Sequence, residues 1–163
     1  CRQVDAASTA ITLLLTHATN GPAMSKESFH QQLAGLAADI AGRPLDVTMG
    51  HADVIWQGDA NEIAIRSLLH CSTPAKMLNV TGPEILSTKW IAEQFGLLLN
   101  KKPTYTGVGA DTALLNNASE CHRLFGYPRT TIREAIEHTA NWLLNGGELW
   151  NKDTHFQERG GKF

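Results

Sequence analysis

The sequence has little of what marks a membrane, secreted or nucleic-acid-binding protein. Its longest apolar stretch runs from Ala10 to Leu15, far short of the roughly 20 residues of a transmembrane helix, and it lacks the basic flank of a signal peptide. Three cysteines are an odd number, which suits reduced thiols in the cytoplasm better than a disulfide framework. The formal net charge of −2 comes without a block of like charges. We therefore expect no nucleic-acid or membrane partner and a cytoplasmic location.

Several catalytic signatures are also missing. A Gly-x-Ser-x-Gly elbow, which would indicate a small hydrolase, does not occur. The nearest approach to a Gly-x-Gly-x-x-Gly cofactor motif is Gly107-Val108-Gly109, with Thr112 at the third position, and we predict a loop there. Cysteine and histidine are adjacent at positions 70–71 and 121–122. This spacing lacks the Cys-x-x-Cys pattern of zinc sites, so we expect no metal.

What the sequence does contain is typical of one globular α/β or α+β unit. The 163 residues are 42% hydrophobic and 18% charged, enough for a hydrophobic core. Short apolar runs alternate with longer helical patterns, which favours mixed architecture. We assign residues 1–147 to this region and residues 148–163 to a polar carboxyl-terminal tail.

Turn and capping residues give the expected elements. Strands are predicted at 11–15, 45–48, 53–56 and 77–80, with an irregular or extended segment at 104–111. Helices are predicted at 25–41, from 59 to about 71, at 87–99, from 117 to about 125 and at 131–144. The predicted caps are Asp59 with Glu62, Ser87, Asn117 with Glu120, and Thr131 with Glu134. Trp90 and Trp142 fall on the apolar faces of their helices and are expected in the core.

Four stretches, in this order, carry a resemblance to a known family. They are ITLLLTHATNGP at 11–22 with the later Gly-Arg-Pro-Leu at 42–45, DVIWQGDAN at 53–61, LNVTGPEILSTKWIAEQFG at 78–96, and the segment 116–143. Together they cover nearly the whole chain. The sequence resembles the carboxyl-terminal part of the NAD-dependent epimerase/dehydratases, the extended short-chain dehydrogenase/reductase family.

This resemblance implies an α/β fold: the substrate-side portion of a Rossmann-type enzyme that lacks most of the dinucleotide-binding sheet. NAD or NADP would belong to the parent protein, and none is expected on the isolated chain. The family's catalytic pair is a Tyr with a Lys four residues on. Here Gly109 follows Tyr105 at that spacing and Thr131 follows Tyr127, so neither fits. The implied partner is the missing Rossmann half or another subunit.

The resemblance also implies where a small-molecule substrate, a sugar derivative among the candidates, would bind. Trp56 and Gln57 end a predicted strand beside a helix start, where ligands bind in α/β proteins. His51 can reach the same pocket, and Asn20 lies in the Gly-Pro turn of the first motif. The alternatives are that Trp56 packs in the core, that Gln57 only turns the chain and that His51 is solvated.

Arginines that hold a nucleotide diphosphate in the family are replaced here. Ala52 stands before the Asp of the second motif, and the other arginine would fall near Thr106. The resemblance therefore gives no support for a nucleotide-diphosphate substrate. An alternative function remains open: a non-catalytic binding or interaction module that keeps this fold. The enzyme portion predicts an exposed apolar face for the missing half, whereas the independent module predicts none.

Overall fold

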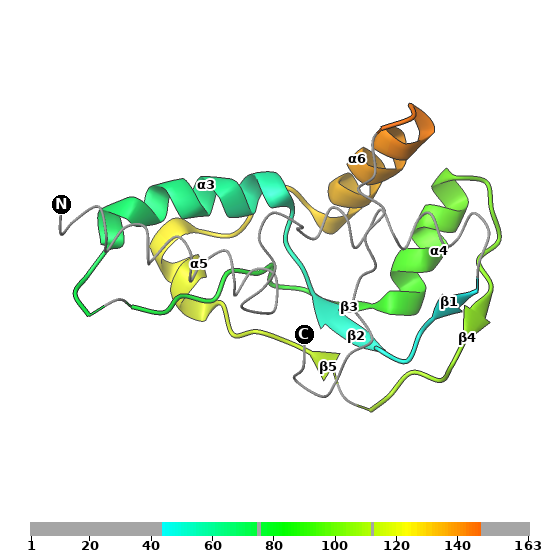
Figure 1. Cartoon of the computed structure of the whole chain (residues 1–163), viewed down its shortest axis with the longest axis horizontal. Helices are drawn as coiled ribbons and strands as arrows, with labels where there is room; N and C mark the ends of the chain where they lie inside the picture. The colour runs from blue at the N-terminus through cyan, green and yellow to red at the C-terminus, as the bar shows by residue number, and fades with distance from the viewer. Residues whose placement is uncertain (1–43, 75, 112, 148–163) are drawn as a thin grey trace.

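The computed structural model describes residues 44–74, 76–111 and 113–147. In chain order the elements are β1 (Leu45–Asp46), β2 (His51–Asp53), α3 (Gln57–Ser67), the 3₁₀ turn η1 (Leu68–His70), β3 (Ile85–Ser87), α4 (Thr88–Leu98), β4 (Tyr105–Thr106), β5 (Ala113–Leu114), α5 (Ser119–Phe125) and α6 (Ile132–Leu144) (Figure 1). The predicted strand at 11–15, the predicted helix at 25–41 and the predicted tail at 148–163 lie outside the described residues.

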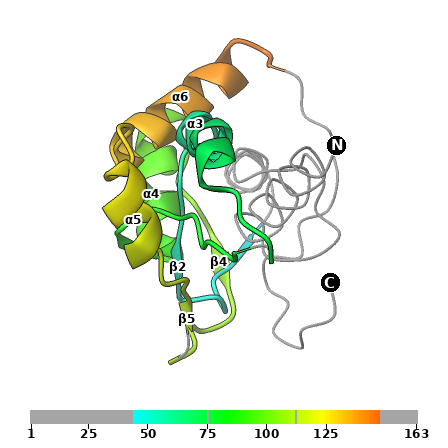
Figure 2. The same ribbon diagram turned by 90° about the vertical axis from the view of Figure 1, so that its left-hand side faces the viewer.

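The strands form two small sheets. β1 pairs in parallel with β4, and β2 lies between β3 and β5, antiparallel to the first and parallel to the second. Figure 2 shows α4, α5 and α6 on the same side of these strands. The mixed α/β class predicted from the alternating pattern is confirmed. The segment 104–111, predicted as irregular or extended, contains the short strand β4.

Two hydrophobic clusters hold the helices in place. One is centred on Phe95 and Ile136, both almost fully buried, and joins α4 and α6 to β1 and β3. The other is centred on Ile63, Val80 and Cys121 and joins α3 to α5. Truncating a buried aromatic such as Phe95 to Ala typically costs about 3–5 kcal/mol. None of the helices in the described ranges is both long and apolar enough to cross a membrane.

Two of the predicted helix starts are confirmed. The Ser87 hydroxyl accepts a hydrogen bond from the Trp90 amide at the start of α4. At the start of α6, Thr131 and Glu134 form the predicted capping box: each side chain accepts from the backbone N–H of the other residue. Both motifs depend on residues three positions apart, which is why sequence alone predicts them.

Two of the predicted strands need correction. β2 covers residues 51–53 and not the predicted 53–56, because the chain leaves the sheet after Asp53 to enter α3. The predicted strand at 77–80 is wrong, since no strand is assigned there. A strand requires a neighbouring strand, and none pairs with this segment among the residues that the structure describes.

The predicted cap at Asp59 is also wrong. α3 begins earlier, at Gln57, with Trp56 in the N-cap position and no side-chain capping bond. The Asp59 carboxylate instead accepts a hydrogen bond from the Thr130 amide at 2.9 Å. This bond joins the first turn of α3 to the residue before the α6 cap, across 71 positions of sequence.

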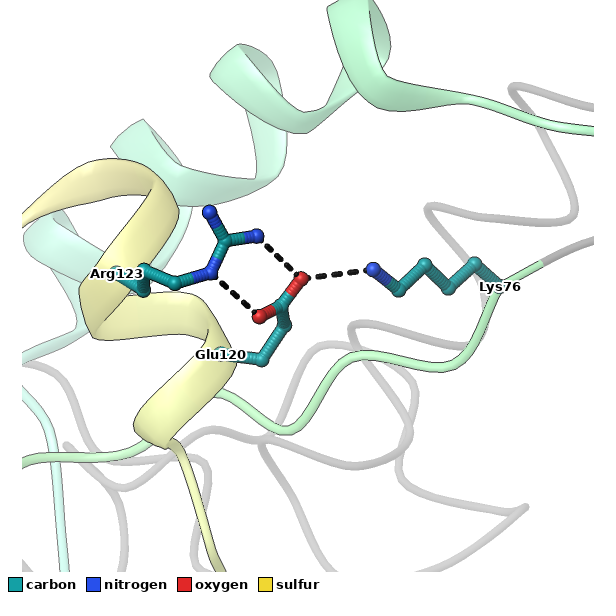
Figure 3. Close-up of polar contacts among 3 residues, drawn as sticks. All are labelled: Lys76, Glu120 and Arg123. Carbon is teal, nitrogen blue, oxygen red and sulfur yellow. Dashed lines mark hydrogen bonds and ion pairs between the residues drawn. The ribbon is translucent and has the colours of Figure 1, made fainter.

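The predicted pairing of Asn117 with Glu120 does not form either. Ala118 is the N-cap of α5, and the Asn117 side chain accepts instead from the amide and the hydroxyl of Ser119. Glu120 turns outward between two bases: Arg123 donates to it at 2.8 and 2.9 Å, and Lys76 at 2.7 Å (Figure 3). These bonds, that of Arg123 first, lower the pKa of Glu120 to about 2.

Of the two tryptophans expected in the core, one lies partly outside it. Trp90 packs against the cluster around Phe95, but Trp142 is 46% exposed. The buried stripe of α6 runs through Ile136 and Ala140 toward Leu143, and Trp142 lies at the edge of this stripe. Helical periodicity defines a face of finite width, so a residue at its margin is the least predictable one.

Candidate functional site

A cavity of about 170 Å³ lies just beyond the carboxyl end of β2. The residues that line it come from the β2–α3 connection, the turn before β3 and the start of α6: Val54, Ile55, Trp56, Gly82, Pro83, Glu84, Pro128, Thr130, Thr131, Ile132 and Ala135. A cavity of roughly 150 Å³ is large enough to hold a benzene ring. The space therefore suits one six-membered ring, with its substituents directed to the open side.

Two of the cavity walls touch through backbone atoms. The Gly82 amide donates to the Val54 carbonyl at 3.0 Å. A Cβ at position 82 would lie 2.2 Å from that same oxygen, closer than atoms can approach. Glycine is therefore required here, because any side chain would push the turn before β3 away from the end of β2.

The start of α6 forms the third wall of the cavity, and it too is held by hydrogen bonds. Asp59 is buried and holds the Thr130 amide, while the capping box of Thr131 and Glu134 orders the first helical turn. Hydrogen bonds to the Thr131 hydroxyl and amide lower the pKa of Glu134. All three walls are thus held by specific bonds, which is the condition for a preformed ligand site.

The lining includes one aromatic and one acidic residue, Trp56 and Glu84. Trp56 is half-buried, and its indole ring lies 5.4 Å from the His138 imidazole, centroid to centroid, at an interplanar angle of 47°. Glu84 is exposed at the cavity mouth. An indole offers a flat apolar surface, whereas a carboxylate accepts hydrogen bonds from hydroxyl or amino groups. Together these residues can bind a polar ring.

The predicted substrate residues are not all brought together. Trp56 lines the cavity. Gln57 is the first residue of α3 and follows Trp56 directly, but it is not part of the lining. His51 is exposed at the opposite end of β2, where it pairs with Ser87. Asn20 lies outside the described residues.

Sequence reasoning missed the other polar residues of the site. Glu84 and Thr130 are 28 and 74 positions from Trp56 in sequence (84 − 56 and 130 − 56), and no local pattern links them. Two local sequence patterns lie beside these residues: the Gly82-Pro83 turn before Glu84, and the capping residues Thr131 and Glu134 after Thr130. Each predicted a turn or a helix start, and neither predicted that the two segments meet.

Asp53 holds the end of β2, next to the cavity, in place. Its carboxylate accepts from the Asn116 amide at 2.7 Å and from the Asn116 side chain at 3.4 Å. Burial raises the pKa of Asp53, and the bonds from Asn116 oppose that shift. Asp53 does not line the cavity. Its bonds anchor the end of β2 to the chain that follows β5.

The Gly107-Val108-Gly109 loop does not have the form of a dinucleotide-binding loop. Gly107-Val108-Gly109 follows β4, as a phosphate-binding loop would follow a strand, but it leads to β5 and not to a helix. The helix N-terminus that would receive a pyrophosphate is therefore missing from this loop. Within the described ranges no group of three or more His, Cys, Asp or Glu side chains is placed to hold a metal ion.

Searches of family models and of curated proteins give no match. Solved structures do match. They include the enzyme WbmH of Bordetella bronchiseptica with NAD⁺ (14% identity, TM-score 0.56), dTDP-glucose 4,6-dehydratase of Bacillus anthracis with NAD (19%, 0.56) and UDP-glucuronic acid 4-epimerase of Bacillus cereus with NAD (16%, 0.55). The matches cover 71%, 75% and 79% of this chain, respectively.

The chain spans only 41–42% of the length of these three enzymes. At such low identity the likeness establishes the fold. The chain has the α/β fold of the carboxyl-terminal part of these NAD-bound enzymes. The resemblance predicted from the four sequence stretches is thereby confirmed at the level of the fold.

Proposed function

We propose that this chain is the substrate-binding portion of an NAD(P)-dependent oxidoreductase of the epimerase/dehydratase kind. Another part of the enzyme would supply the cofactor site and the catalytic pair, since the patterns Gly-x-Gly-x-x-Gly and Tyr-x-x-x-Lys do not occur in these 163 residues. The fold supports this division, since the chain corresponds to about two-fifths of three enzymes that were solved with NAD bound. NAD or NADP would carry hydride in the complete enzyme.

The cavity beside Trp56 is the observation that carries the proposal. It lies where ligands bind in open α/β sheets, beyond the carboxyl end of a strand. Its volume suits one ring. A pyranose has apolar C–H groups on its faces and hydroxyls at its edge, matching the Trp56 indole and the polar groups of Glu84 and Thr130. Two of the similar enzymes are named for sugar nucleotides, which supports a sugar derivative as substrate.

In this proposal the chain binds and orients, and its residues have separate roles. Trp56 stacks against the ring, and Glu84 and Thr130 hold substituents at the mouth of the cavity. Ile55 and Ala135, both buried, exclude water from the apolar side. Gln57, His51 and Asn20 remain predicted substrate contacts that the assembled enzyme would complete. Transfer of a proton or hydride belongs to the other part.

Exposed apolar side chains supply a surface for that other part. On the last turns of α3 and on η1, Ile65, Leu68 and Leu69 are 69%, 42% and 89% exposed. These three residues are spaced three and four positions apart and share one helical face.

The alternative, a self-sufficient binding module, predicts that such apolar surface is small. Binding of a fluorescent dye to exposed hydrophobic surface of the native protein distinguishes the two hypotheses. Strong dye binding that Leu69→Ser lowers favours the enzyme portion, and weak dye binding favours the binding module. The proposal also places the protein in the cytoplasm, where its three thiols remain reduced.

Two NMR titrations of the ¹⁵N-labelled chain test the proposal. Methyl α-D-glucopyranoside has about 13 non-hydrogen atoms, and at roughly 0.3 kcal/mol per atom its Kd is on the order of 1 mM. We expect it to shift the Trp56 indole N–H and the amides of Thr130 and Ile132, and we expect NADH to shift none. Trp56→Ala should abolish the response, while Trp142→Ala should retain it. Saturable NADH binding, or no response to the sugar, would contradict the proposal.

A further inference from the structure

Glu84 brings an unneutralised negative charge to the cavity. It lies in the turn between Gly82 and β3, lines the cavity and is exposed. The ion pairs of the described chain join other residues, and none of them includes Glu84. A ligand in the cavity would have Glu84 as a neighbour.

The bases nearest to this site in sequence are directed elsewhere. Arg129 pairs with Glu62 at 3.3 Å. Arg133 donates to Gln94 at 3.3 Å, and its guanidinium lies 5.5 Å from the centre of the Trp90 ring. Neither arginine lines the cavity. Among the residues that the structure describes, no arginine belongs to the cavity lining.

The backbone just before α6 already binds two carboxylates of the chain. A helix N-terminus attracts anions through its free amides, but here two carboxylates of the chain serve that role. Glu134 accepts from the Thr131 amide at 2.8 Å, and Asp59 accepts from the Thr130 amide at 2.9 Å. Of the carboxylates of Glu134, Asp59 and Glu84, only that of Glu84 belongs to a residue that lines the cavity.

We infer that Glu84 is a specificity-determining residue, which selects a ring with a neutral hydrogen-bond donor and rejects the same ring with a carboxylate. The inference rests on the proposed function and names the substrate class more narrowly. A hydroxymethyl group can donate to Glu84, whereas a ring carboxylate would face a like charge. Two unit charges about 4 Å apart in water-like surroundings repel by an amount equivalent to about fivefold in affinity.

The test compares two matched ligands on the full 163-residue chain by NMR titration at low salt. One is methyl α-D-glucopyranoside, and the other is the same glycoside with a carboxylate at carbon 6. In the wild type we expect the neutral ring to bind about fivefold more tightly. In Glu84→Gln, which keeps the shape and removes the charge, the ratio should fall below about twofold. Glu93→Gln, an exposed glutamate on α4 outside the cavity lining, is the control and should keep the wild-type ratio.

The outcomes separate the inference from the function on which it rests. A ratio that is the same in wild type and Glu84→Gln, with both ligands bound at Trp56, overturns the role of Glu84 and leaves the proposed function standing. Binding of neither ligand to the wild type overturns both. A ratio that also falls in Glu93→Gln shows a general effect of net charge, and this result too overturns the specific role of Glu84.

Discussion

Removal of the Asp59 carboxylate should destabilise the protein more than removal of any exposed acidic group. Asp59 is 9% exposed and accepts the Thr130 amide at 2.9 Å. A hydrogen bond to a charged group contributes about 1.5–3 kcal/mol. An acid in the first turn of a helix adds about 0.3–1 kcal/mol through the helix dipole. We therefore expect Asp59→Ala to lower the free energy of unfolding by about 2–3 kcal/mol.

The assay is urea unfolding of the whole chain, followed by far-ultraviolet circular dichroism. At about 2–4 °C per kcal/mol for a domain of this size, the same change should lower Tm by roughly 4–12 °C. Asp59→Asn keeps an acceptor oxygen but loses the charge, so it should fall between Ala and the wild type. Asp111→Ala, at an exposed position, is the control and should remain within about 0.5 kcal/mol of the wild type.

A loss below about 0.5 kcal/mol for Asp59→Ala would refute the reasoning. Such a result would mean that water replaces the carboxylate at the Thr130 amide without cost. The start of α6 would then not be held by α3, and the third wall of the cavity would lack the support assigned to it.

Three further predictions test other parts of the structure. Gly82→Ala should lower stability by about 1–3 kcal/mol in urea, since its Cβ would lie 2.2 Å from the Val54 oxygen; wild-type stability would contradict that contact. Glu120 has its folded pKa lowered from 4.5 to about 2 by Arg123 and Lys76, so its contribution is present above pH 4.5 and lost as the pH falls toward 2. The urea midpoints of the wild type and Glu120→Gln should therefore converge as the pH is lowered over this range. A difference between the midpoints that does not change with pH would contradict a stabilising role for the ion pairs of Glu120. Burial raises the pKa of the Cys121 thiol, so iodoacetamide should label the half-buried Cys71 before it labels Cys121. Equal labelling of these two cysteines, followed by peptide mapping, would contradict the burial of Cys121.

Sequence predicted those parts of the fold that are determined by neighbouring residues. The starts of α4 and α6 are correct because Ser87 and Thr131 bond to groups three positions away. The α/β class is correct because it follows from alternating periodicities. The segment 77–80 was predicted as a strand because its side chains have that character, but the presence of a strand depends on a partner that the local sequence does not specify.

The candidate site was only partly predictable for the same reason. The position of Trp56 at a strand end predicts a ligand contact, and the residue lines the cavity; the contact itself stays a prediction. Asp59 was interpreted as a cap because Asp is favoured there, yet a longer-range bond to Thr130 uses its carboxylate. Glu84 had no distinguishing pattern at all. Its position became informative only when the fold brought the turn after Gly82 beside α6.

The intact mass of the protein, purified as its source makes it, tests the central claim most directly. If the chain is the substrate-binding portion of a larger enzyme, the mass should lie well above 17.8 kDa, or the chain should co-purify with a second subunit. Peptide sequencing should then find a Tyr-x-x-x-Lys pair and a Gly-rich motif in the additional part. A mass of 17.8 kDa with no partner bound would contradict the account and leave an independent binding module as the explanation.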